Sequence, residues 1–197
     1  MMHFARMSIV ALCALTLSAC LGGGKKVPPM LLTLTSSAPA PADLNRSAVP
    51  GETITIDVPV ISKELATTRV PAQVGPTAVA YIKDLQWVES PDRLFQDLVQ
   101  ETVMRTTNRV VLDPRQSGFD PGTRLTGTLS RFGYDAQEGM VIVRYDAALA
   151  VPGGTQVETR RFEAREPADG TASTVGAALN EAANRVAADV AQWVGGH

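Results

Sequence analysis

Apolar and polar residues alternate without a break over residues 53–60. The even positions are apolar and would share one face: Ile54, Ile56, Val58 and Val60. A period of two over eight residues predicts a half-buried strand. Pro59, near its end, favours an edge or a strand terminus because proline donates no backbone hydrogen bond.

Two stretches repeat apolar residues at helical spacing instead. The first follows Ser90-Pro91-Asp92 and runs to about Thr106, with Ser90 as the expected cap and Pro91 at the first helical position. The second runs from about Ser173 to Val194. Its apolar residues recur at steps of three and four: Val175, Leu179, Ala182, Val186, Val190 and Trp193. Both patterns predict amphipathic helices that bury one face.

Three extended segments lie between these helices, at 125–134, 140–151 and 156–165. Short turns at 136–139 and 152–154 predict an antiparallel meander. The third segment carries many charges, so much of it should meet water. The charged residues around Phe162 are Arg160, Arg161, Glu163 and Arg165.

The remaining apolar runs are shorter. Residues 30–34 predict an edge strand, and residues 110–112 predict a buried strand that ends at Asp113-Pro114. Residues 36–51 predict a surface loop. Residues 61–80 are interrupted by prolines and a glycine, so we expect short extended pieces there, with Tyr81-Ile82 at a strand end.

This order of elements predicts an α+β fold. We expect a two-layer sandwich, with a mostly antiparallel sheet and two main helices packed on one face. The length suits a single domain. We therefore expect one α+β periplasmic domain over residues 52–197, preceded by residues 20–51 as a lipidated cysteine, a flexible tether and a short edge strand.

The compartment is indicated by the first twenty residues. A weakly basic start and an apolar run from Met7 to Leu17 predict a secretory signal over 1–19. Leu17-Ser18-Ala19-Cys20 resembles a lipobox, which predicts cleavage between Ala19 and Cys20 and lipidation of Cys20. The alternative is an ordinary signal peptide with a chance cysteine at its end. Leu21 favours anchoring at the outer membrane over the inner membrane.

Cysteine and histidine usage limits the chemistry. The two cysteines are Cys13, in the signal, and Cys20, and the two histidines are His3 and His197. After processing, the folded body would hold no thiol and no imidazole, so we expect no triad catalysis, no thiolate or imidazole metal site and no cofactor. Carboxylate-pair chemistry stays open, although the acidic residues are scattered. A formal net charge of −2 gives no basic surface for nucleic acid.

A looser pattern carries a family resemblance. Its parts are Tyr81, the run Trp87-Val88-Glu89-Ser90-Pro91 that opens a leucine-bearing helix, Cys20 and the long last helix. Together they resemble the ABC-type transport auxiliary lipoproteins, which include paraquat-inducible protein C-like proteins. Residues 62–80 depart from the family's pattern. The resemblance implies a non-catalytic component beside an Mce-domain protein and an ABC permease and ATPase, with phospholipid as a candidate ligand.

Several alternatives remain open from the sequence. Tyr81 and Trp87 suit either an interface or core packing around the start of the first helix, with core packing the commoner outcome. The arginines of 156–165 suit either lipid headgroups or a solvated strand face. The alanine-rich last helix suits a homo-oligomer or the sheet. For the whole protein, the competing functions are a structural or assembly lipoprotein of a Tol-like envelope complex and a lipid carrier with an apolar cavity.

Overall fold

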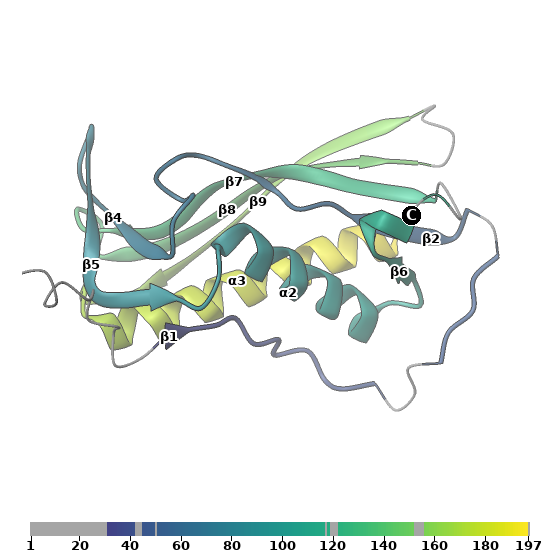
Figure 1. Cartoon of the computed structure of the whole chain (residues 1–197), viewed down its shortest axis with the longest axis horizontal. Helices are drawn as coiled ribbons and strands as arrows, with labels where there is room; N and C mark the ends of the chain where they lie inside the picture. The colour runs from purple at the N-terminus through teal and green to yellow at the C-terminus, as the bar shows by residue number, and fades with distance from the viewer. Residues whose placement is uncertain are drawn as a thin grey trace, which may run out of the picture.

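The computed structural model describes residues 31–41, 45–49, 51–116, 118, 122–151 and 156–196. One large open sheet is covered on one face by two helices (Figure 1). The fold is α+β with a mostly antiparallel sheet, as predicted from the sequence. The expected turn at 152–154, the signal and the tether lie outside the described residues.

The longest strand organises the sheet. It is β7 (Thr123–Asp135), and it pairs antiparallel with β8 (Met140–Ala150), which pairs in turn with β9 (Val157–Pro167). The turn between β7 and β8 is held by Asp135, whose carboxylate accepts the backbone N–H groups of Gln137 at 3.0 Å and Glu138 at 3.2 Å. The three strands predicted as a meander are confirmed.

The other edge of β7 is shared by three short strands, one after another. These are β2 (Thr53–Ile56), β3 (Val60–Ile61) and β4 (Arg69–Gly75), all parallel to β7. Outside them lie β6 (Val110–Leu112) next to β2, β5 (Ala78–Trp87) next to β4, and β1 (Leu31–Leu32) next to β5. The predicted strand at 110–112 is half-buried instead of buried, because it pairs only with β2 at an edge.

The alternation over 53–60 was wrong as a single strand. The strand β2 ends at Ile56, and the chain leaves the sheet at Asp57, whose carboxylate accepts two hydrogen bonds from Arg124 on β7 at 2.8 and 3.0 Å. The side-chain alternation is lost across this break. Val58 and Val60, expected inside, are therefore 37% and 67% exposed.

Residues 61–80 hold short extended pieces, as predicted, but the strand end expected at Tyr81-Ile82 was wrong. The strand β4 forms a hairpin with the ten-residue β5, so Tyr81 lies inside a strand. Pro71 is tolerated because the register shifts beside it, and a β-carbon at Gly133 would lie 2.5 Å from its carbonyl oxygen. The same shift includes Asp84 on β5, which has φ 58° and precedes the residues of β5 that pair with β1.

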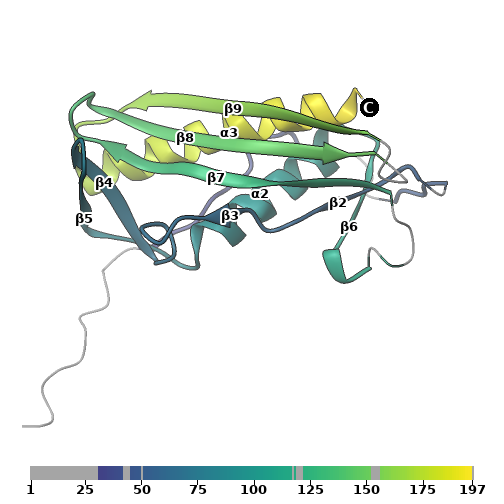
Figure 2. The ribbon, with the colours of Figure 1, turned by 90° about the horizontal axis from the view of Figure 1, so that it is seen from above.

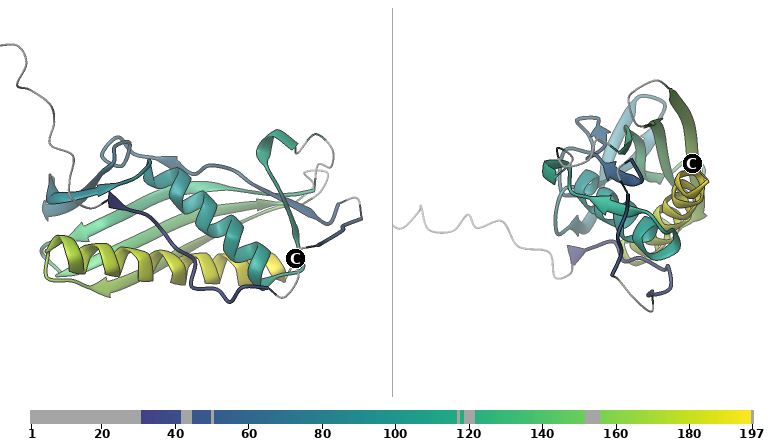
Figure 3. Two further views of the ribbon diagram at one scale, coloured as in Figure 1. Left: turned by 60° about the horizontal axis from the view of Figure 1, so that its bottom comes forward. Right: turned by 90° about the vertical axis from the view of Figure 1, so that its right-hand side faces the viewer.

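Both predicted helices are confirmed, as α2 (Pro91–Thr106) and α3 (Ala172–Gly195). A short 3-10 turn at Pro114–Gln116 lies between β6 and β7. Both lie on the same side of the β7–β8–β9 meander (Figures 2 and 3). Ser90 occupies the N-cap of α2, but its side chain makes no capping hydrogen bond. The core between the layers is centred on an aromatic cluster, in which Phe95 lies 6.3 Å from Phe132 and 5.3 Å from Tyr145 between ring centroids.

Candidate functional site

The molecule has two distinct ends. At one end, here called the β1 end, lie β1, the β4–β5 hairpin, the β7–β8 turn and the start of α3 (Figures 1 and 2). At the opposite end, called the C-terminal end, lie the last turn of α3, β6 and the beginning of β2 (Figure 3). The residues that can meet ligands or partners divide between these ends.

Tyr81 lies on the β1 end, half-buried in β5. Its hydroxyl donates to the backbone oxygen of Glu64 at 3.4 Å, and the guanidinium carbon of Arg69 lies 3.7 Å from its ring centroid. A cation over an aromatic face is a favourable contact in a partly solvated position. Tyr81 thus joins the hairpin to the preceding loop and still reaches the surface.

Trp87 and Pro91 lie further along, past the bend at Asp84. Trp87 is 2% exposed, and its ring centroid lies 5.4 Å from that of Phe132. Its Nε1 has no hydrogen-bond partner among the described residues. Pro91 is buried at the first position of α2. These two residues fix the entry of the helix into the core, and neither presents a surface to a partner.

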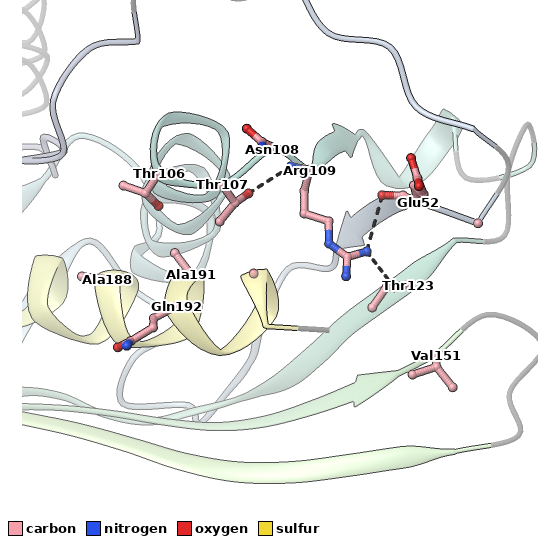
Figure 4. A pocket seen from close by; sticks show the side chains of 12 residues that line it. Glu52, Thr106, Thr107, Asn108, Arg109, Thr123, Val151, Ala188, Ala191 and Gln192 are labelled. Carbon is pink, nitrogen blue, oxygen red and sulfur yellow. Dashed lines mark hydrogen bonds between the residues drawn. The ribbon is translucent and has the colours of Figure 1, made fainter.

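A cavity of about 850 Å³ opens at the C-terminal end (Figure 4). It lies where both helices end, beside the beginnings of β2 and β7. Small and polar side chains line it, and they come from five stretches of the chain. They are Gly51, Glu52, Thr106, Thr107, Asn108, Arg109, Thr123, Val151, Ala188, Ala191, Gln192 and Gly195.

Arginines supply the positive charge near this cavity. Arg109 donates to the backbone oxygen of Glu52 and to the Thr123 hydroxyl, each at 3.4 Å. Arg46 donates to the backbone oxygens of Thr107 and of Arg109. Cations are favoured at helix C-termini, where the last carbonyls carry partial negative charge. The long Arg109 contacts leave part of its guanidinium hydrogen-bonding capacity for a ligand, so the cavity suits a polar or acidic group.

A strap, residues 33–41, crosses the outside of the helix layer. Asn184, 8% exposed on α3, accepts the N–H of Ser37 at 2.7 Å and donates to the Thr35 oxygen at 2.9 Å. Asn180 accepts the Thr35 N–H at 2.9 Å. The strap is therefore fixed to α3 through its backbone, and the chain that leads to Cys20 enters the domain at β1.

The outer face of the sheet is covered with ion pairs. Asp146 on β8 pairs with Arg161 on β9, and hydrogen bonding to this guanidinium holds the pKa of Asp146 below its ordinary value. Arg165 pairs with Glu163 and Glu138. Arg160 lies on the opposite, helix-side face of β9, where its guanidinium carbon is 5.1 Å from the ring centroid of Phe162. The ion pairs match a solvated strand face, on which Arg161 and Arg165 are both neutralised by neighbours.

Within the described ranges no group of three or more histidine, cysteine, aspartate or glutamate residues could hold a metal ion. In that part of the chain, no helix has both the length and the apolar character required to cross a bilayer. The candidate sites in the described ranges are exposed surfaces and the open cavity at the C-terminal end.

Two solved structures share this architecture. Protein XCC0632 from Xanthomonas campestris, of family DUF330, superposes with a TM-score of 0.65 at 15% identity, over 85% of this chain and 92% of that one. An uncharacterised protein superposes with a TM-score of 0.62 at 14% identity, over 76% and 96% of the two chains. At these identities the likeness shows a common fold. No curated protein matches the chain.

Together these features define a two-layer α+β domain with an open cavity at one end, lined by both polar and apolar residues. The model of the ABC-type transport auxiliary lipoprotein component family matches residues 32–191. The chain belongs to this family, as the resemblance at Tyr81, Trp87 and Pro91 predicted.

Sequence reasoning missed two features of the surface. The cavity is assembled from residues that lie far apart in the sequence, such as Glu52, Arg109 and Gln192, and no local pattern indicates it. The exposed hairpin between β4 and β5 was missed as well. It did leave a signal, because residues 70–82 contain no charged side chain.

Proposed function

We propose that the protein is a non-catalytic auxiliary lipoprotein of an ABC transport system that moves phospholipid with an Mce-domain protein. The mature chain is anchored through Cys20 at the periplasmic face of the outer membrane. The observation that carries the proposal is the family match over residues 32–191, which begins twelve residues after the lipobox-like sequence at Cys20. A permease and an ATPase in the inner membrane complete the system.

The anchor gives the domain an orientation. Eleven peptide steps separate Cys20 from Leu31, and an extended chain spans at most about 3.6 Å per residue, or roughly 40 Å in all. The β1 end is therefore held near the bilayer. The cavity lies at the opposite end of the molecule and faces the periplasm, where a polar or acidic segment of the Mce-domain partner can reach Arg109.

The cavity supports docking over lipid carriage. A carrier needs apolar walls for acyl chains, whereas Glu52, Asn108, Arg109 and Gln192 line this cavity. The space between the sheet and the helices is filled by packed side chains such as Phe95 and Phe132. Phospholipid contact is therefore assigned to the assembled transporter. The alternative function, a structural lipoprotein of a Tol-like complex, would use the same docking cavity with a different protein partner.

Crosslinking of the lipidated protein in intact cells, followed by mass spectrometry, tests the partner. We expect recovery of an Mce-domain protein. A matched pair of variants on α3 tests the cavity. Ala188→Arg fills its rim and should reduce the crosslink severalfold, whereas Ala177→Arg, on an exposed turn near the other end of the helix, should not. Recovery of Tol-system or peptidoglycan-linked proteins alone would contradict the proposal.

A further inference from the structure

The end of the β4–β5 hairpin is an exposed and uncharged segment rich in apolar residues. We define the hairpin tip as residues 74–80. Val74 and Val79 are 49% and 42% exposed, and all the other residues of the tip except Gly75 are exposed too. Three of the other exposed valines, Val58, Val88 and Val157, each have an acidic residue beside them in the sequence. A contiguous apolar projection of this kind marks a surface that contacts something.

The polar groups of the tip are few and mostly satisfied within it. Residues 70–82 carry no charge, and Gln73, at the base of the tip, donates its side-chain amide to the oxygen of Gly75. The backbones of the two strands pair across the turn, at Gln73 with Val79 and at Gly75 with Ala78. Little desolvation cost therefore opposes transfer of this turn into a less polar medium.

A ring of interfacial residue types surrounds the base of the tip. Arg69 and Lys83 flank the uncharged run, and Tyr81 lies beneath the Arg69 guanidinium. Tyrosine and basic residues are favoured at the level of lipid headgroups, where phosphates are negative. Two acidic residues lie at the same level: Asp84 adjoins Lys83 in β5, and the backbone oxygen of Glu64 accepts the Tyr81 hydroxyl.

The position of the tip matches the end of the described chain. The hairpin and the beginning of β1 lie at the same end of the molecule (Figures 1 and 3). Leu31 begins the described chain, pairs with Gln86 on β5 and is itself 44% exposed. Residues 20–30, which would lead to the lipid, therefore join the domain beside the last residues of β5, at the base of this hairpin. Among possible occupants, the bilayer is the one that the chain would bring to this surface.

We propose that the hairpin tip is a membrane-contact element that enters the headgroup region of the bilayer. The proposal rests on the anchor at Cys20 in the proposed function. The tip and the anchor together make two attachment points, which hold the domain upright with its cavity away from the membrane. Elements of this kind bury their apolar side chains about 5–10 Å into the headgroup and acyl boundary.

Site-specific fluorescence on the lipidated full chain tests this directly. The Val79→Cys variant is labelled with the environment-sensitive dye NBD and reconstituted into phosphatidylcholine vesicles with anionic lipid. The control is Val157→Cys, another exposed valine in a strand, treated in the same way. Lipids with a spin label near the headgroup should quench the dye at 79 at least severalfold more than the dye at 157. Adding Val74→Asp to the Val79→Cys chain should remove most of this quenching, whereas adding Val60→Asp should not.

Two outcomes overturn the proposal, and they differ in kind. Equal quenching at 79 and 157, in protein that floats with the vesicles, rules out bilayer contact by the tip and leaves the anchor intact. A protein partner would then be the occupant. Wild-type chain that takes up the dye has a free thiol at Cys20, and wild-type chain that fails to float is not anchored in the bilayer. Either result removes the anchor on which the proposal rests.

Discussion

Leu32 on β1 packs directly against Gly176 on α3, so that a β-carbon at position 176 would lie 2.9 Å from Leu32 Cδ2. This contact joins the first described strand to the last helix. Gly176→Ala should displace Leu32, while the added helix propensity of about 1 kcal/mol offsets part of the loss. The backbone N–H of Val88 donates to the Leu32 oxygen at 2.9 Å, so its hydrogen exchange should accelerate. Ala177→Ser, on the exposed neighbour, should leave that exchange rate unchanged.

Asn184 should matter more to stability than Asn180, although both hold the strap. Asn184 is buried and makes two hydrogen bonds to the strap backbone, whereas Asn180 is half-buried and makes one. Asn184→Ala leaves the Ser37 N–H and the Thr35 oxygen without this partner, at a cost of about 1–3 kcal/mol. Urea denaturation should show a clearly smaller loss for Asn180→Ala. Equal losses would mean that the strap is not fixed through Asn184.

The limits of sequence prediction are clear at Asp57 and Pro71. The helices were predictable because their spacing is local and is repeated over many residues. The end of β2 was not, because it depends on Arg124, which pairs with Asp57 from 67 residues further along. The local sequence around Pro71 predicts a break in the strand. The strand β4 nevertheless continues through Pro71, because Gly133 on β7 has no side chain to obstruct the Pro71 carbonyl. Contacts between distant residues decided both positions.

The candidate sites differ in the same way. Arg109, Glu52 and Gln192 are ordinary residues in their own segments, and only the fold brings them to one cavity. The hairpin tip is different, because its uncharged run is continuous in the sequence. It was overlooked because the proline and glycine within the run are also typical of irregular loops.

Glycine substitutions distinguish close packing from open turns. A β-carbon at Gly127 on β7 would lie 2.4 Å from the Asp146 oxygen and 2.7 Å from the ring of Tyr145. Gly127→Ala must therefore move a strand or an aromatic ring in the core, and overpacking of this kind typically costs about 1–3 kcal/mol. At Gly75 the nearest neighbour is the Ala78 β-carbon at 3.6 Å, which is ordinary contact. Thermal unfolding should thus show a large loss for Gly127→Ala and little change for Gly75→Ala.

Asp169 should make the protein less stable in acid. Its carboxylate accepts hydrogen bonds from the Thr174 hydroxyl and from the Thr171 N–H, which lower its pKa from 3.8 to about 2. Because the folded pKa lies below the unfolded one, the contribution is present above about pH 4 and is lost as the pH falls through 2. The urea midpoint of wild type should therefore fall over this range more steeply than that of Asp169→Asn.

Asp97 supplies a control of the opposite sign. Desolvation, with the negative charge of Glu89, raises the pKa of Asp97 above 3.8. A raised folded pKa disfavours the folded state at neutral pH and favours it on acidification. Asp97→Asn should then fall more steeply in acid than wild type. Parallel curves for all three proteins would show that neither carboxylate is linked to folding in this way.

The lipid anchor can be separated from the fold by one substitution. In Cys20→Ala the thiol that would carry the lipid is absent, and each buried CH₂ of an acyl chain contributes about 0.8 kcal/mol to membrane binding. The protein should therefore leave the membrane fraction, while its circular dichroism and its urea midpoint stay at the wild-type values, because Cys20 precedes the first described strand at Leu31. The hairpin tip alone is too small to hold the domain on a vesicle. Retention of Cys20→Ala in washed membranes at wild-type levels would contradict both the lipobox and the role given to the tether.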